Sequence, residues 1–150
     1  MTMSVLGRHV LLLCLAWGLV GCAGAIKPVS APTVAADPYR ITGQVTYRER
    51  IALPPKSVVT VVLEDISLAD RAAVTMAETV MVTDRNQVPF KFLLELDSAA
   101  LQPRHRYAVR ATIHDVRGQL LWTTDTVHAI DPAQSGADLG ELVLVRVTSR

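Results

Sequence analysis

The sequence predicts an all-β fold, an antiparallel seven-stranded β-sandwich of the immunoglobulin- or transthyretin-like type, with a small β-barrel as the alternative. From Tyr39 onward, apolar and polar residues alternate in short runs, as they do in strands with one buried face. Turn residues separate these runs, with about one turn signal per strand. Only 5% of the residues are aromatic, which favours a thin aliphatic core over a platform for stacking a ligand.

The first two predicted strands are separated by a proline turn. Apolar residues occupy every second position from Ile41 to Tyr47. The segment Leu53–Lys56 ends this strand, because its two prolines lack a backbone donor. The next run, "SVVTVVLEDIS", is rich in β-branched residues, and its inward positions are predicted to be Val59, Val61 and Leu63.

The third and fourth strands are predicted at about residues 73–83 and 88–96, on either side of the turn "DRNQ". The following segment, "DSAALQP", is expected to be one helical turn or a loop that crosses between sheets. Asp97 or Ser98 would cap it, since both side chains accept bonds from backbone N–H groups.

The last three strands follow the same rule. In the fifth, Tyr107, Val109, Ala111 and Ile113 alternate with polar or small residues. The hairpin turn "HDVRGQ" places Gly118 at its tight position. The sixth run is "LLWTTDTVHAI", and the seventh is "LGELVLVRVTS", whose apolar character predicts burial on both faces or a central place in a sheet.

The amino terminus has the layout of a secretory signal. Arg8 precedes the apolar run Val10–Val20, which is too short to span a membrane and is followed by turn-prone sequence. A buried internal helix is the alternative interpretation. The segment Leu19-Val20-Gly21-Cys22 then resembles a bacterial lipobox, in which an aliphatic and a small residue precede the cysteine to be lipidated. Residues 1–21 are therefore predicted to be a lipoprotein signal peptide.

Cys22 is the predicted lipidation site, carrying a covalent diacylglyceryl group and an N-acyl chain. Leu19, Val20 and Gly21 would be the peptidase recognition residues. A competing site is the triplet Ala23–Ala25, where ordinary signal peptidase would release a soluble protein. Several acyl chains would anchor the protein stably. Because Ala23, not aspartate, follows the cysteine, resemblance to enteric lipoproteins favours the periplasmic face of the outer membrane.

Residues 22–38 are predicted to be the lipidated cysteine and a flexible tether, because the segment is rich in proline and small residues and lacks apolar periodicity. Residues 39–150 form the predicted domain. Beyond residue 21 the chain has 14 basic and 14 acidic residues, so charge gives no case for a nucleic-acid partner. Cys14 lies in the apolar run, so no disulfide is expected within the mature chain.

The sequence shows no pattern that indicates catalysis. The mature histidines are His105, His114 and His128, and their spacing matches no metal site, so no metal is expected. Glu64 and Asp65 face opposite sides of a strand, and Asp65 is expected to cap a neighbouring loop. The other acidic residues considered for a paired-carboxylate site are Glu78, Asp84 and Asp125. No nucleophile motif, phosphate-binding loop or mature free thiol is present.

The cluster Arg48, Glu49 and Arg50 has two interpretations. A charged strand end is most often only solvated. Alternatively, the cluster contacts a partner protein, since arginine is enriched at interfaces. Trp122 is predicted to be a core residue.

The segment "ITGQVTYRERIALPPKSVVTVVLEDISLAD", Ile41–Asp70, resembles the opening of the YscW/YbaY family of type III secretion lipoprotein chaperones. "VPFKFLLELD" and "RHRYAVRATIHDVRGQLLWTTDT" resemble its later segments, so the likeness extends to about Ile130. The resemblance implies a small lipoprotein with a β-sandwich and, for some members, a pilotin role in which a secretin subunit is escorted to the outer membrane. It implies no catalytic residues or other cofactor.

Three functions are consistent with these patterns. The first is a lipid-anchored binding protein or chaperone, whose sheet edge accepts a segment of a client. The second is an envelope enzyme or a binder of carbohydrate or another small ligand. The third is a structural lipoprotein of the envelope, which shares every feature of the first except a dedicated client.

Overall fold

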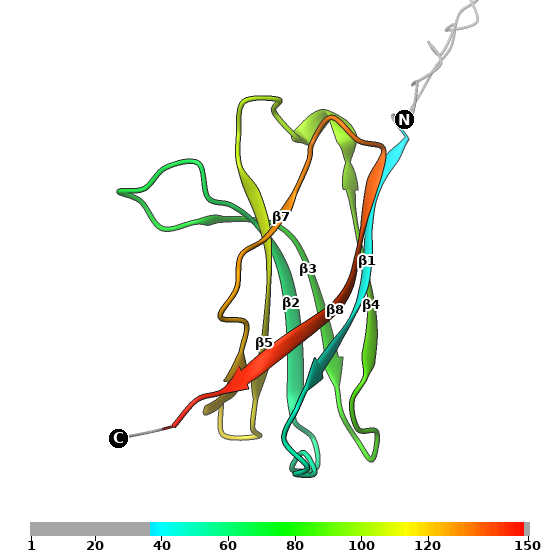
Figure 1. Ribbon diagram of the computed structural model, residues 1–150, viewed down its shortest axis with the longest axis vertical. Coiled ribbons are helices and arrows are strands. Elements are labelled where there is room, and N and C mark those ends of the chain that lie inside the picture. The colour runs from blue at the N-terminus through cyan, green and yellow to red at the C-terminus, as the bar shows by residue number, and fades with distance from the viewer. Residues whose placement is uncertain (1–36, 149–150) are drawn as a thin grey trace, which may run out of the picture. The chain divides into compact units, whose positions relative to one another are not determined.

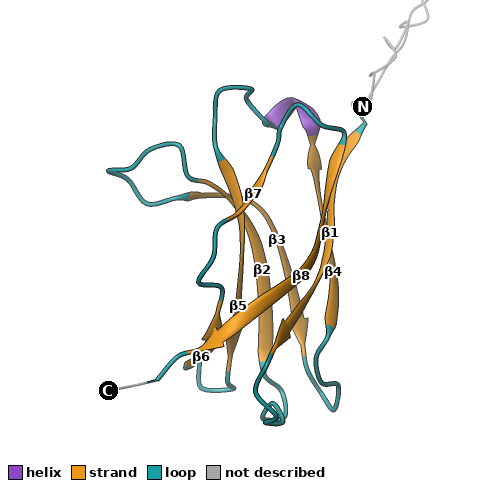
Figure 2. Ribbon diagram, viewed as in Figure 1, coloured by secondary structure: helices purple, strands orange, loops and turns teal. Residues whose placement is uncertain are grey.

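The computed structural model describes residues 37–148, which form eight strands and one short 3-10 helix. Figure 2 shows this helix, η1, as a single purple turn among orange strands. The elements are β1 (Pro38–Tyr47), β2 (Val58–Asp65), β3 (Val74–Val82), β4 (Phe90–Asp97), η1 (Ser98–Ala100), β5 (Tyr107–His114), β6 (Leu120–Thr123), β7 (His128–Ile130) and β8 (Gly136–Arg146). The predicted all-β class is confirmed.

The strands belong to one continuous sheet in the order β3-β2-β5-β6-β8-β1-β4, with β7 paired to β5. A short ladder from β6 to β8, which pairs Trp122 with Arg146, joins the two halves of this sheet. The first and last strands of the order, β3 and β4, contact each other without pairing. The predicted sandwich of two separate sheets is therefore not what forms, and the barrel alternative describes the fold better, because the sheet curls around one core.

One pair of strands departs from the predicted antiparallel arrangement. β1 and β8 are parallel, and their register shifts between Thr42 and Gln44. The two strands are parallel because residues 131–135 reverse the direction of the chain after β7. As a result, β8 starts beside Arg40, at the beginning of β1, and both strands run toward the same end. Figure 1 shows β8 crossing obliquely in front of β2. Of the two alternatives predicted for this apolar strand, the central place is confirmed, since β8 lies between β6 and β1. Burial on both faces is wrong, because only Leu142 and Leu144 are buried.

The sixth predicted strand is two strands, because the segment pairs with both ends of β5. Trp122 of β6 pairs with Ile113 near the end of β5, whereas Ile130 of β7 pairs with Tyr107 at its beginning. Between these two strands, Thr124 still donates its N–H to the carbonyl of Ala111 at 3.0 Å, and residues 125–127 lie outside the ladder.

The core follows the predicted alternation. Val59, Val61 and Leu63 are fully buried in β2. Each such side chain contributes about 1.5–3 kcal/mol by leaving water. Trp122 is 3% exposed, which confirms its assignment to the core. The remaining inward positions of the first and fifth predicted strands that are buried are Ile41, Val45, Tyr47, Tyr107, Val109, Ala111 and Ile113.

Two turns form as their sequences predict. Asp97 caps η1, since its Oδ1 accepts from the backbone N–H of Ala99 at 2.8 Å. In the β5–β6 turn, Gly118 has a φ of 79°, a conformation that favours glycine. Asp115 stabilises this turn by accepting from the N–H groups of Arg117 and Gln119 at 2.8 and 2.9 Å.

Apart from residues 124–127, the connections gather at two ends of the barrel, because each strand reverses the direction of the one before it except β7, which runs in the direction of β6. The near end, where the chain reaches β1, contains residue 37 and connections 66–73, 98–106 and 131–135. The far end contains connections 48–57, 83–89 and 115–119 and the last residues after β8. Figure 1 shows the amino end of β1 and the turns of the far end at opposite ends of the long axis.

Candidate protein-binding site

The three charged residues that follow β1 lie at the far end in different environments. Arg48 and Arg50 are exposed, whereas Glu49 is half-buried. Oε2 of Glu49 accepts a hydrogen bond from Nε1 of Trp122 at 3.3 Å. The two arginines are therefore presented to solvent, while Glu49 has a structural role in fixing the end of β1.

An aromatic stack supports this corner. The rings of Tyr47 and Trp122 lie 4.6 Å apart at 18°. The guanidinium carbon of Arg146 lies 6.0 Å from the centre of the Trp122 ring, within reach of a cation–π interaction. The Tyr47 hydroxyl donates to the carbonyl of Ile51 at 2.6 Å. Burial, followed by the nearby charge of Glu49, raises the pKa of Tyr47, so the phenol stays protonated as a donor.

Backbone and side-chain bonds join the two longer connections of the far end. The N–H of Lys56 donates to the carbonyl of Thr83 at 2.6 Å, and the N–H of Thr83 donates to the carbonyl of Ser57 at 2.7 Å. Oε1 of Gln87 accepts from the N–H of Leu53 at 2.8 Å. The surface of this end is therefore held by internal bonds before any partner arrives.

The short strand β7 and the two longer end strands β3 and β4 each have an edge that pairs with no other described strand. β3 pairs only with β2, and β4 pairs only with β1. On β3 the exposed fractions of Val74, Val80 and Val82 are 59%, 54% and 65%. Unpaired backbone groups beside exposed apolar side chains can accept an added strand from another chain.

Asp65 ends β2 in a network that stabilises the near end. Its Oδ1 accepts from the N–H of Ser67 at 2.9 Å and from the Ser67 hydroxyl at 2.5 Å. Its Oδ2 lies 2.6 Å from Nδ1 of His105. The Ser67 and His105 hydrogen bonds lower the pKa of Asp65 to about 2. The predicted loop-capping role of Asp65 is confirmed. Ser67 and His105 each bond the Asp65 carboxylate and not each other, so they do not form a serine–histidine relay.

The other acidic residues considered from the sequence are dispersed. Glu64 pairs with Arg110 across the outer face, so it does point away from Asp65. Glu78 lies on β3, Asp84 in the β3–β4 connection and Asp125 between β6 and β7, and all three are exposed.

The histidines are also separated. His105 bonds Asp65, His114 ends β5 and His128 begins β7. Within residues 37–148 no group of three potential ligand side chains could hold a metal ion.

The hollows on the surface are lined by mixed charges. One of about 510 Å³ lies over the β1–β8 register shift, with Lys91, Asp138 and Glu141 on its rim. Another, of about 290 Å³, is lined by Arg48, Asp125 and the end of β8. Each hollow is lined by two carboxylates, Asp138 and Glu141 in the first and Glu49 and Asp125 in the second. All four accept hydrogen bonds from neighbouring protein groups: Asp138 from the N–H of Gly140, Glu141 from Gln44, Glu49 from Trp122 and Asp125 from Thr126.

The predicted lipidation residue Cys22 and the recognition residues Leu19, Val20 and Gly21 lie outside the described residues. Within the described range, no helix is long and apolar enough to cross a membrane.

The profile of a family described as "Type III secretion system lipoprotein chaperone (YscW)" matches residues 36–140. The chain belongs to the YscW family. A relative in this group is the uncharacterized lipoprotein YbaY of Escherichia coli K12, which is 33% identical over 147 residues, covering 90% of this chain and 76% of YbaY. The resemblance drawn from the sequence is confirmed.

One solved structure shares the fold. It is an alternative pilotin from the type II secretion system of Vibrio cholerae, 41% identical, with a TM-score of 0.67. The match covers 75% of this chain and 99% of the pilotin, so the whole of that pilotin corresponds to the barrel described above.

The far-end surface is the feature that sequence reasoning only partly reached. Arg48 and Arg50 form a visible cluster in the sequence because only Glu49 separates them, whereas the other basic residues of this surface come from separate turns. Strand direction was the available signal, since alternate connections of a meander meet at the same end.

Proposed function

We propose that this protein is a non-catalytic, lipid-anchored chaperone of the outer membrane that binds a secretin subunit and escorts it there, as a pilotin does. The observation that carries the proposal is the 41% identity to a pilotin along 99% of that pilotin's chain. Family membership supports the same role, because the family is one of secretion-system lipoprotein chaperones.

The arrangement of the barrel suits a carrier. The segment predicted as a tether reaches the fold at Pro38, so the far end and the edges of β3 and β4 remain accessible to a client. The described carboxylates and histidines are dispersed or serve structural bonds, so they supply no acid–base pair. Binding the client and the membrane with different parts of one chain is sufficient for escort, since two linked attachments raise the effective concentration of the client at the membrane.

The escort role is tested by deleting the gene in the native host and following each secretin of that host by envelope fractionation. We expect at least one secretin to remain unassembled or outside the outer membrane, and the full-length chain to restore it. If every secretin assembles normally in the deletion strain, the escort proposal is wrong.

The anchor is tested with Cys22→Ala and with Cys14→Ala as a matched control. We expect Cys22→Ala to leave the outer-membrane fraction and to lose escort, whereas Cys14→Ala behaves as wild type. Mass spectrometry of the mature amino terminus should find an acylated Cys22. A chain beginning at Ile26, or outer-membrane retention of Cys22→Ala, would exclude the lipid anchor.

A further inference from the structure

The two ends of the barrel carry opposite charge excesses. At the far end, the connections and the strand residues that flank them include six basic residues, Arg48, Arg50, Lys56, Arg85, Arg117 and Arg146. The same stretches include three acidic residues, Glu49, Asp84 and Asp115. At the near end the order is reversed, with three basic residues, Arg71, Arg104 and Arg106, against five acidic ones, Asp37, Asp65, Asp70, Asp97 and Asp131.

Two of the three acidic residues at the far end are already engaged. Glu49 accepts from Trp122, and Asp115 accepts from the turn that it caps. Asp115 also pairs with Arg117, with Oδ2 and Nε 3.5 Å apart. Asp84 is the remaining acidic residue of these stretches, and Asp125 of the β6–β7 connection lines the hollow beside Arg48. The basic residues still outnumber these two carboxylates, so the charge that this surface offers to an approaching molecule is positive.

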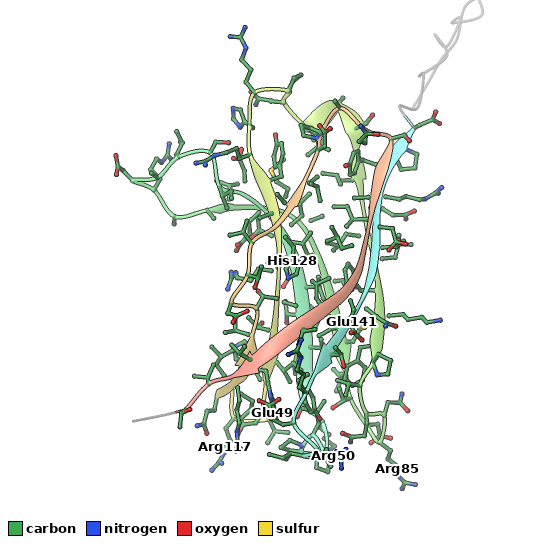
Figure 3. The ribbon with its side chains drawn as sticks, in the orientation of Figure 1. Glu49, Arg50, Arg85, Arg117, His128 and Glu141 are labelled. Carbon is green, nitrogen blue, oxygen red and sulfur yellow. The ribbon has the colours of Figure 1, made fainter. Side chains whose placement is uncertain are left out.

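Four basic side chains of the far end are exposed and have no ion-pair or hydrogen-bond partner within residues 37–148: Arg48, Arg50, Lys56 and Arg85. Figure 3 shows Arg50 and Arg85 at the bottom of the barrel, with Arg117 also near this end. Apolar side chains interrupt the charges, since Ile51 and Val116 are 44% and 64% exposed. The surface is therefore basic with apolar positions, and its connections are already held in place by the bonds described above.

We infer that the far end is the docking surface for an acidic segment of the client protein, one that carries apolar residues among its Asp and Glu side chains. This inference rests on the proposed escort function and names the surface that would perform it. Charge complementarity selects the acidic segment, and Ile51 and Val116 would contact its apolar side chains. A surface fixed before binding loses little conformational entropy when the client docks.

The position of the predicted tether favours a protein over an anionic membrane. A flexible segment of about 15 residues has a root-mean-square length of roughly 20 Å. The 11 residues of β8, which cross the barrel obliquely, span about 35 Å along the strand. Because the tether joins the near end, the far end would have to turn over and stretch the tether to reach the lipid surface. The near end also has an acidic excess, which an anionic surface would repel.

The experiment places a photo-crosslinking amino acid at Val116, on the far end, or at Ala100, on the near end, in the full-length protein in its native host. We expect position 116 to crosslink one protein strongly and position 100 to crosslink it weakly or not at all. The crosslinked peptide should be richer in Asp and Glu than in Lys and Arg. Adducts with lipid alone, adducts with a segment that is not acidic, or no adduct at 116 would each overturn the inference.

Charge is tested in the same strain with the triple variant Arg50→Gln, Lys56→Gln and Arg85→Gln. We expect the adduct to fall roughly tenfold, because three exposed ion pairs with the client are removed. The matched control Arg71→Gln, Arg104→Gln and Arg106→Gln changes the net charge equally at the near end and should keep the adduct. The variant Arg50→Lys, Arg85→Lys should also keep it. Equal crosslinking by the two triple variants would overturn the inference.

The secretin assay separates this inference from the escort proposal. If the far-end triple variant loses its adduct and still escorts the secretin, the far end is not the surface used for escort. The inference is then wrong, whereas the proposed escort function is retained. If deletion affects no secretin but the acidic adduct persists, the surface stands and the client is another protein.

Discussion

Nε1 of Trp122 lies 3.3 Å from Oε2 of Glu49, although 73 residues separate them in the chain. This bond links the end of β1 to β6, the strand that joins the two halves of the sheet. It therefore ties the corner that presents Arg48 and Arg50 to the ladder that completes the barrel.

Replacing Glu49 with leucine should destabilise the domain. The change leaves the indole N–H of Trp122 without its acceptor in a side chain that is 3% exposed. We expect the free energy of unfolding to fall by about 1–3 kcal/mol. Glu49→Gln keeps an acceptor oxygen and should lose less than half as much. Urea unfolding of residues 37–150, followed by the fluorescence of Trp122, measures both variants, and equal stability of Glu49→Leu and wild type would show that the bond contributes nothing.

Gly43 is required by a close approach within the sheet. A Cβ atom at this position would lie 2.9 Å from the ring of Phe92 and 3.1 Å from the carbonyl oxygen of Gly140. Gly43→Ala should therefore cost about 1–3 kcal/mol by overpacking. In a double-mutant cycle measured by urea unfolding, Gly43→Ala should cost less in a Phe92→Leu background, where the ring is absent. An equal cost in both backgrounds would mean that Phe92 is not the source of the strain.

The alternation of side chains predicted which residues are buried but not how the sheet closes. Val59, Val61 and Leu63 face the core as their β-branched run indicated. The same alternation fits a sandwich and a barrel equally well, because it reports only which face of a strand is covered. The closing contact pairs Trp122 with Arg146, and the parallel pair joins β1 to β8 from the two ends of the domain. Such long-range neighbours leave no local signal.

For the candidate site, the sequence likewise predicted local roles but not which distant residues come together. The capping role of Asp65 followed from its place at a strand end, and the bond to the N–H of Ser67 confirms it. Its second partner, His105, lies 40 residues away and was missed. The signal was topological, because the end of β2 pairs with the beginning of β5. Arg50 and Arg85 both lie at the far end for a similar reason, since the connections 48–57 and 83–89 leave the sheet at the same end of the barrel.

Acidification should weaken the near end through Asp65. Its pKa is about 2 in the folded protein, against about 3.9 in an unfolded chain. A depressed pKa contributes stability that is present above about pH 4 and is lost as the pH falls toward 2. Asp65→Asn should therefore lower stability at pH 7 and flatten the decline between pH 4 and pH 2, measured as the urea midpoint at each pH. An unchanged slope in this variant would assign the acid sensitivity to other carboxylates.

Thr83 offers the opposite case, a buried polar atom whose removal should stabilise the fold. Its side chain is 2% exposed, and its Oγ1 has no hydrogen-bond partner within residues 37–148. The backbone bonds of Thr83 to Lys56 and Ser57 do not involve this hydroxyl. Thr83→Val keeps the shape and removes the desolvated group, so it should raise the free energy of unfolding by about 1 kcal/mol. Thr83→Ser, which keeps the hydroxyl and loses the methyl group, should lower it. Urea unfolding measures both variants. If Thr83→Val is less stable than wild type, the hydroxyl has a hydrogen-bond partner in solution and the prediction is wrong.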